Sequence, residues 1–104
     1  MQEFEQARLQ AEIVKVLANP IRIVMIQHLK KNGPMTVTEL KDLFDVRISA
    51  VSKHLKLLRE YGIVQDEKKA NKVYYTLSVP CITDFLGCTI EIAKKITGIS
   101  GQFH

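Results

Sequence analysis

Apolar residues recur at helical spacing through the first third of the chain. Residues 3–18 and residues 20–31 each predict an amphipathic helix. Asn19 and Pro20 separate them, because the residue before a proline avoids the helical conformation and Asn19 can cap a helix that starts at Pro20. An Asn-Gly-Pro sequence then ends the second helix. The chain therefore begins with two helices joined by a sharp turn.

Two more helices are predicted at close spacing. Thr36 and Glu39 have the spacing of a capping box, which starts a short helix that we expect to reach Phe44. The next periodic segment, residues 47–61, has an apolar side and a narrow, basic polar side. The polar side holds Ser49, Ser52, Lys53, Lys56 and Glu60. Within this helix we expect His54 to pack beside the apolar side or to hydrogen-bond to the backbone.

Strand-forming residues follow Gly62. Residues 63–65 and 73–77 are rich in β-branched and aromatic side chains, and the polar stretch 66–72 between them predicts the tip of a β-hairpin. This tip carries Lys68, Lys69 and Lys72. Asn71 is the tip residue best suited to a left-handed turn.

A last helix is predicted after Pro80, running to about Ile96. Its apolar residues cover well over half of its circumference, which is more than one packed face of a small domain needs. We therefore expect part of this surface, with the apolar side of the first helix, to meet a second copy of the chain. The expected dimer contacts are Leu9, Ile13, Ile82, Phe85, Leu86 and Ile92.

The order of these elements predicts a mainly α fold with a small β-hairpin wing, which is the layout of a winged helix-turn-helix. With 104 residues, the chain has the length of one domain. We expect residues 1–104 to form a DNA-binding domain flanked by N- and C-terminal dimerisation helices. In such a fold one helix fits the major groove while the adjoining ribbon reaches phosphates or the minor groove.

The charge of the chain is concentrated in one segment. Fifteen basic residues exceed eleven acidic ones, for a net charge of +4. Residues 47–72 contain seven basic and three acidic residues, so they account for the whole excess. This distribution favours a polyanion as partner. No uncharged apolar run approaches the roughly 20 residues that span a bilayer, and the N-terminus lacks the layout of a signal peptide, so we expect a cytoplasmic protein with no membrane contact.

Five segments, taken in order, resemble successive motifs of the ArsR/SmtB repressors. They are LANPIR at 17–22, TVTEL at 36–40, AVSKHLKLLR at 50–59, GIV at 62–64 and VYYTL at 73–77. The resemblance covers roughly residues 12–78, and as an ordered set the motifs are highly specific. It implies a homodimeric repressor that binds double-stranded operator DNA. It also implies release of that DNA when an inducer is sensed, usually a metal ion or a thiol-reactive species.

The resemblance also indicates which residues meet DNA. Ser49, Ser52 and Lys53 match the positions where the family's recognition helix contacts base edges and phosphates, and Lys56 shares their face. A solvated helix surface is the alternative interpretation, but an exposed helix seldom carries serines, which are mediocre helix formers, at adjacent positions. The predicted DNA-binding residues are Arg47, Ser49, Ser52, Lys53, Lys56, Lys68, Lys69 and Lys72.

The start of this helix departs from the family pattern. Arg47 and Ile48 stand where the family commonly has a serine cap and a glutamine. Arg47 can contact a phosphate, whereas Ile48 cannot hydrogen-bond to a base. We therefore expect a sequence preference that differs from that of better-known members.

The two familiar metal sites of the family are not supported by this sequence. One needs a pair of cysteines in the third helix, and residues 40–44 contain none. The other uses Asp and His on the last helix, where this chain offers Asp84 and Glu91 without a histidine. Zinc favours nitrogen or sulfur donors, so a zinc site of this kind is not expected.

Cys81 and Cys88 remain as candidate sensing residues. They lie on nearly the same side of the last helix, with their Cα atoms about 10 Å apart, beyond the roughly 7 Å limit of a disulfide. If the helix pairs with its symmetry mate, four thiols can bind a soft ion such as Cd(II), Pb(II) or As(III), or form disulfide or persulfide links. The alternative is that both are small hydrophobes in a packed interface. Asp84 and Glu91 disfavour the thiolate of Cys88, which argues against high redox reactivity.

A second function fits the same fold. The chain can be a winged-helix protein-interaction module with structural cysteines and no inducer, binding its partner through the apolar last helix. The sequence contains no nucleophile–base pair, phosphate-binding loop or cluster of metal ligands, so we do not expect an enzyme.

Overall fold

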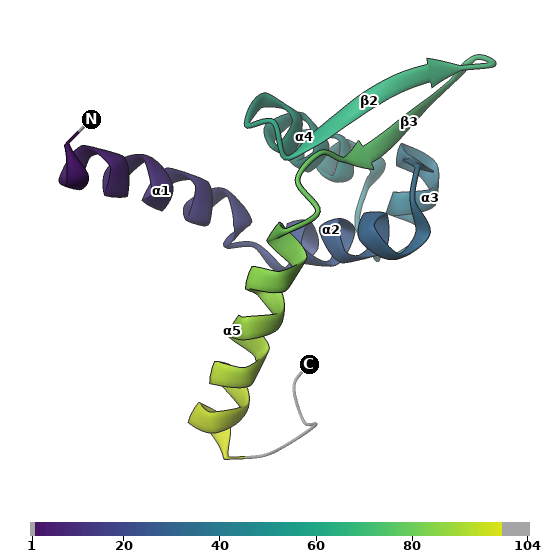
Figure 1. Ribbon diagram of the computed structural model, residues 1–104. Coiled ribbons are helices and arrows are strands. Elements are labelled where there is room, and N and C mark those ends of the chain that lie inside the picture. Colours follow the sequence, from purple (N-terminus) through teal and green to yellow (C-terminus); the bar gives the residue numbers. More distant parts are fainter. Residues whose placement is uncertain (1, 99–104) are drawn as a thin grey trace.

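The computed structural model describes residues 2–98; Met1 and residues 99–104 of the expected domain lie outside the described part. The described chain folds into helices and a small sheet in the order that the sequence predicts, with one extra strand (Figure 1). The elements are α1 (Glu3–Leu17), α2 (Pro20–Asn32), β1 (Met35–Thr36), α3 (Val37–Lys41), α4 (Ile48–Glu60), β2 (Val64–Lys69), β3 (Lys72–Leu77) and α5 (Ile82–Thr97). The prediction of a mainly α, winged helix-turn-helix fold is confirmed.

The turn between α1 and α2 is built as predicted. The Asn19 side-chain oxygen accepts hydrogen bonds from the amides of Ile21 at 2.9 Å and Arg22 at 3.2 Å. Pro20 occupies the first turn of α2, where its missing amide hydrogen costs nothing. The two helices therefore meet at a fixed corner.

The capping box at the start of α3 is also confirmed, but the helix is shorter than expected. The Glu39 amide donates to Thr36 Oγ1 at 3.2 Å, and the Thr36 amide donates to Glu39 Oε1 at 2.9 Å. The helix ends at Lys41 rather than at Phe44. The amides of Leu43 and Phe44 bond three residues back, which tightens the chain into a turn. This turn leads directly into α4.

The sheet is antiparallel with the strand order β1-β3-β2. The expected long tip at residues 66–72 is wrong, because β2 continues to Lys69 and β3 begins at Lys72. Only Ala70 and Asn71 form the turn, with φ of 49° and 69°, as in two-residue hairpins of the type that follows strand twist. The left-handed conformation expected for Asn71 is confirmed. Strand β1 was not predicted; it pairs with the middle of β3.

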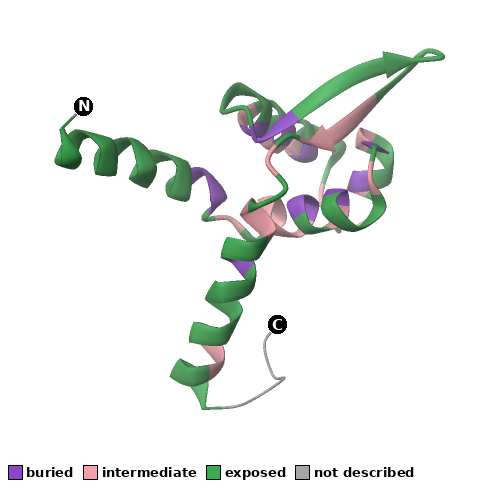
Figure 2. Cartoon of the chain, viewed as in Figure 1, coloured by how far each residue is buried: buried purple, intermediate pink, exposed green. Residues whose placement is uncertain are grey.

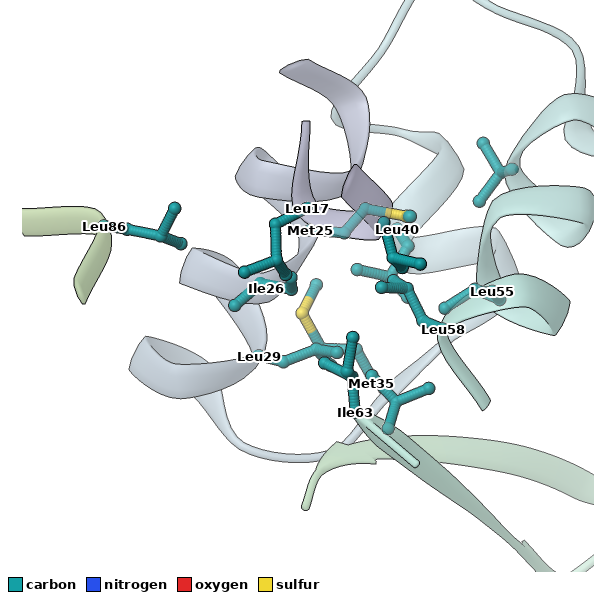
Figure 3. Close-up of a cluster of buried hydrophobic side chains, with 13 residues drawn as sticks. Leu17, Met25, Ile26, Leu29, Met35, Leu40, Leu55, Leu58, Ile63 and Leu86 are labelled. Atoms are coloured by element: carbon teal, nitrogen blue, oxygen red, sulfur yellow. The ribbon is translucent and has the colours of Figure 1, made fainter. Parts of the chain in front are cut away.

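The hydrophobic core lies between α2, α3, α4 and the base of the wing. Figure 3 shows its side chains, among them Met25, Ile26, Leu40, Leu55 and Leu58, all with no exposed surface. These residues hold α4 and the hairpin in a fixed relation to α2.

Helices α1 and α5 project away from this body in different directions and are exposed along most of their length (Figures 1 and 2). They are called the arms below. The radius of gyration is 15.2 Å, against about 13 Å for a compact domain of this size. Among the helices described between residues 2 and 98, none is long and apolar enough to cross a membrane.

Candidate nucleic-acid interface

Helix α4 has one buried and one exposed side. Val51, Leu55 and Leu58 are completely buried in the core, which fixes the rotation of the helix about its axis. The opposite side is open to solvent and carries the polar residues that the sequence singled out. Ser49, Ser52, Lys53 and Lys56 are all exposed there, with the exposed Arg47 at the N-cap. We call these five residues the reading face.

The first residues of α4 are unusual for a helix start. Arg47 makes no side-chain hydrogen bond as N-cap, because a guanidinium has no acceptor atom. The helix therefore presents a positive side chain at the positive end of its own dipole, which is a favourable place for an anion. Ile48, the first helical residue, keeps 48% of its surface exposed.

The wing lysines are divided between the two faces of the ribbon. Residues alternate between faces along a strand, and directly paired residues share a face. Lys68 therefore lies on the face of Asp66, whereas Lys69 and its partner Lys72 lie on the face of Glu67. All three lysines are exposed near the turn. The structure therefore brings the three predicted wing lysines to one tip of the hairpin but not to one face of it.

Two ion pairs shape the charge of the wing. Arg59 Nη1 at the end of α4 lies 3.1 Å from Asp66 Oδ2 on β2. On the other face, Lys69 Nζ lies 3.2 Å from Glu67 Oε1. Lys68 and Lys72 belong to none of the ion pairs found between residues 2 and 98. These two lysines are therefore the ones whose charge is not offset by a neighbouring carboxylate.

The side of α4 that faces α2 holds a polar contact that sequence reasoning missed. His54 Nδ1 lies 3.0 Å from Arg22 Nη1, and the residue is partly buried, so the expected packing beside the apolar side of α4 holds and the hydrogen-bond partner is a side chain rather than the backbone. Partial burial and, second, the positive charge of Arg22 lower the pKa of His54 below its ordinary value. The partners are 32 residues apart in sequence, and local spacing cannot reveal such a pair.

The two candidate sensing cysteines lie on the α5 arm. Cys81 is the N-cap residue of α5 and Cys88 lies within the helix; both are free thiols exposed in the single chain. Within residues 2–98 no group of three or more His, Cys, Asp or Glu could hold a metal ion. A metal bound through these thiols would need ligands from a second chain.

The predicted dimer contacts differ in their burial. Leu9, Ile13, Phe85 and Ile92 are exposed on the arms. Ile82 packs partly against the core, and Leu86 is only 4% exposed, because it reaches the edge of the core cluster (Figure 3). Other large apolar side chains, which the predicted dimer contacts did not include, are also exposed. They are Phe4, Val14, Ile48, Tyr61, Val73, Ile90 and Ile96.

Known proteins share both the sequence pattern and the architecture. The helix-turn-helix domain family matches residues 17–67. The nodulation protein NolR of Rhizobium meliloti is 30% identical over 91 residues, which are 88% of this chain and 74% of NolR. The arsenical resistance operon repressor of Escherichia coli is 34% identical over 67 residues, 64% of this chain and 57% of that protein. The chain belongs to the ArsR/SmtB family.

A solved structure supports this assignment to the ArsR/SmtB family. The crystal structure of NolR from Sinorhizobium fredii matches 88% of this chain and 96% of its own, with 31% identity and a TM-score of 0.77. The family consists of DNA-binding transcriptional regulators and not of enzymes. In this ArsR/SmtB member the reading face thus belongs to the helix that follows the tight turn of a helix-turn-helix.

Proposed function

We propose that the protein is a homodimeric repressor that places α4 of each protomer in the major groove of operator DNA, with the wing over the flanking phosphates. The observation that carries this proposal is the exposed reading face beside a lysine-bearing wing. Serine hydroxyls and lysine ammonium groups hydrogen-bond to base edges, and lysine and arginine also bind phosphate. The whole positive excess of the chain lies in residues 47–72, which hold α4 with its N-cap, strand β2 and the first residue of β3.

Ile48 indicates a preference of the recognition helix for one kind of base. N-terminal residues of a recognition helix contact base edges, and Ile48 is the first residue of α4 with 48% of its surface exposed. The apolar group that the major groove offers is the 5-methyl group of thymine. We assign Ile48 to a contact with such a methyl group in each half-site.

The arms are proposed to form the dimer. Only Val16 and Leu17 of α1 and only Leu86 of α5 are buried within the chain. Single helices of about 15 residues are marginal in water without packing on one face. A second copy would cover the apolar residues of both arms and would set two reading faces about 34 Å apart, one helical turn of DNA. The doubled positive charge would also strengthen attraction to the duplex.

Cys81 and Cys88 are proposed as the inducer site of this repressor. Four exposed thiols on the arms of a dimer are soft ligands suited to Cd(II), Pb(II) or As(III), and one relative is an arsenical resistance operon repressor. Disulfide or persulfide links between the arms are the second chemistry that these thiols allow. Either change at the arms would alter the spacing of the reading faces and release the operator. Such a repressor would work in the cytoplasm, where the operator lies.

The second candidate function is a protein-interaction module with structural cysteines and no inducer. The exposed apolar arms favour it, since they could bind a different protein instead of a second copy. A monomer in solution with no preference for any duplex would support this candidate.

A binding experiment tests the repressor. The full chain is titrated with a duplex from the region upstream of its own coding sequence and with a scrambled duplex, at about 50 and 200 mM salt. We expect a preference for the upstream duplex and a steep loss of affinity with salt. Equal affinity for both duplexes would contradict sequence-specific repression, and a flat salt response would contradict DNA binding. Light scattering on the same samples gives the oligomeric state.

A further inference from the structure

The Arg22 side chain touches three helices at once. It extends from the first turn of α2, where Asn19 Oδ1 accepts a hydrogen bond from the Arg22 amide. Its Nε donates to the Val16 carbonyl oxygen at 2.6 Å, and its Nη1 lies 3.0 Å from His54 Nδ1. Val16 is near the end of the α1 arm, and His54 is in the recognition helix. One guanidinium therefore links an arm to the helix that carries the reading face.

The chemistry of each contact explains why arginine stands here. The Val16 carbonyl is one of the last four carbonyl groups of α1, and these groups accept no hydrogen bond from an amide of the same helix. A guanidinium carries several donors at fixed angles, so it can satisfy this carbonyl and a second acceptor together. A lysine ammonium is a single point charge on a flexible chain and does not reproduce this geometry.

The contact also fixes the state of the His54 ring. Arginine stays protonated and only donates, so His54 Nδ1 must carry the lone pair and the ring must be neutral. A protonated ring would put two cations 3.0 Å apart. Among the charged groups on the helices around the ring, Arg22 is the one whose charge acts on it. Partial burial and, second, this charge lower the pKa of His54 and favour the neutral ring.

We propose that Arg22 is a positioning residue that holds the recognition helix in register with the α1 arm, and that the link holds only while His54 is neutral. The inference rests on the proposed function, because it assumes that α1 belongs to the dimer and α4 to the DNA contact. Acid weakens operator binding through this link, since protonation of His54 breaks it. The added positive charge alone would have the opposite effect on DNA affinity.

Substitutions at Arg22 test the link. Arg22→Gln removes the charge and the two-acceptor bridge, so the preference for the upstream duplex over the scrambled one falls about tenfold. Lys31→Gln, at the exposed far end of α2, removes the same charge and leaves the preference within about twofold. Arg22→Lys keeps the charge but does not restore the preference. Full preference in Arg22→Gln or Arg22→Lys would overturn the proposal.

The pH profile separates positioning from a merely structural role. As the pH falls from about 7 to about 5, the parent protein loses preference for the upstream duplex, and the loss begins below the ordinary histidine pKa of 6.5, because the lowered pKa of His54 delays its protonation. In His54→Asn the amide oxygen replaces Nδ1 as acceptor and does not titrate, so its preference stays constant over the same range. Identical profiles for the parent and His54→Asn would overturn the proposal. Circular dichroism at both pH values shows that each variant is folded.

A measurement on the free protein tests the link between Arg22 and His54 independently of DNA binding. Nitrogen NMR of the free protein reports the pKa and the tautomer of His54. We expect the hydrogen on Nε2, and we expect Arg22→Gln to raise the pKa towards its ordinary value, because the nearby charge is gone. An unchanged pKa, or a hydrogen on Nδ1, would overturn the link. If the parent shows no duplex preference, the proposed function fails, and this measurement still decides the link.

Discussion

Arg59 Nη1 lies 3.1 Å from Asp66 Oδ2, and this pair joins the last turn of the recognition helix to the first strand of the wing. The two side chains are 47% and 33% exposed. An exposed pair contributes about 0.2–1 kcal/mol to folding, which is small beside the burial of the α4 core residues. We expect its effect to be on direction, because it ties the ribbon at one angle to the helix that carries the reading face.

Asp66→Asn tests this role against a matched change on the other face of the ribbon. Both Asp66→Asn and Glu67→Gln remove one negative charge near the DNA, which favours binding. Glu67→Gln also frees Lys69 and tightens operator binding about threefold. Asp66→Asn gains less, because the wing loses its tie to Arg59, and its free energy of unfolding falls by less than about 1 kcal/mol. Equal gains in affinity would show that the pair does not direct the wing.

Lys53→Ala is expected to remove one phosphate or base-edge contact from the reading face. Operator affinity falls, and the slope of the logarithm of affinity against the logarithm of salt concentration becomes shallower by about 0.9 for each phosphate lost. Lys30→Ala, exposed on α2, serves as the control and leaves the slope unchanged. A salt titration by fluorescence anisotropy measures both. The same slope in both variants would contradict the placement of Lys53 at the DNA.

The proposed contact of Ile48 can be tested by removing the methyl group from the DNA. Deoxyuridine in place of one thymine per half-site weakens binding of the parent by about 0.8 kcal/mol per half-site, or about fifteenfold for the two half-sites together, at the position that Ile48 contacts. Ile48→Ala binds both duplexes equally, whereas Ser49→Ala still distinguishes them. If Ile48→Ala retains the full difference between thymine and deoxyuridine at every position, Ile48 does not read a methyl group.

Substitutions at two residues of α5 are expected to have different effects, one on the dimer and the other on folding stability. Ile92 is 57% exposed, so Ile92→Asp yields a folded monomer with weakened operator binding, measured by light scattering and anisotropy. Leu86 is 4% exposed within its own chain, so Leu86→Ala lowers the free energy of unfolding by about 2–5 kcal/mol, measured by urea denaturation. Lys95→Asp places the same carboxylate on the exposed polar side of α5 and leaves the dimer intact. A dimeric Ile92→Asp would contradict the role of the arm.

Cysteine variants test whether Cys81 and Cys88 form the inducer site. Cys81→Ser and Cys88→Ser are compared with the parent while operator release is titrated with Cd(II), As(III) or a persulfide donor. We expect each variant to need at least about tenfold more of the effective inducer, because each loses a soft ligand or a reacting thiol. Mg(II), which prefers oxygen ligands, releases nothing and is the control. Release of DNA by the variants at the same concentration as the parent would make the cysteines structural.

Local chemistry was sufficient to predict most of the fold. The Asn19 cap, the capping box of Thr36 and the buried side of α4 depend on residues within one or two helical turns, and all three are confirmed. The length of the wing strands was underestimated, because residues 66–69 are polar and exposed on both faces. Such a ribbon is held by its backbone ladder and its two-residue turn, which leave no hydropathy pattern.

The details of the site that sequence reasoning missed depend on long-range contacts. The link from Arg22 to His54 spans 32 residues, and strand β1 forms only because β3 passes beside Met35 and Thr36. Leu86 was placed with the dimer residues because apolar residues cover well over half of the circumference of its helix, and periodicity cannot tell which part of that arc meets its own core. The division of the wing lysines between two faces likewise required the strand register.

The distribution of the core along the chain has a consequence for how such a protein can diverge. The α1 arm buries two of its 15 residues and the α5 arm one of its 16, so nearly all arm positions are free of the packing that holds the body together. Substitutions there cost little folding energy. In the proposed repressor, partner choice and inducer chemistry can therefore change between descendants while the body that carries the helix-turn-helix is inherited nearly unaltered.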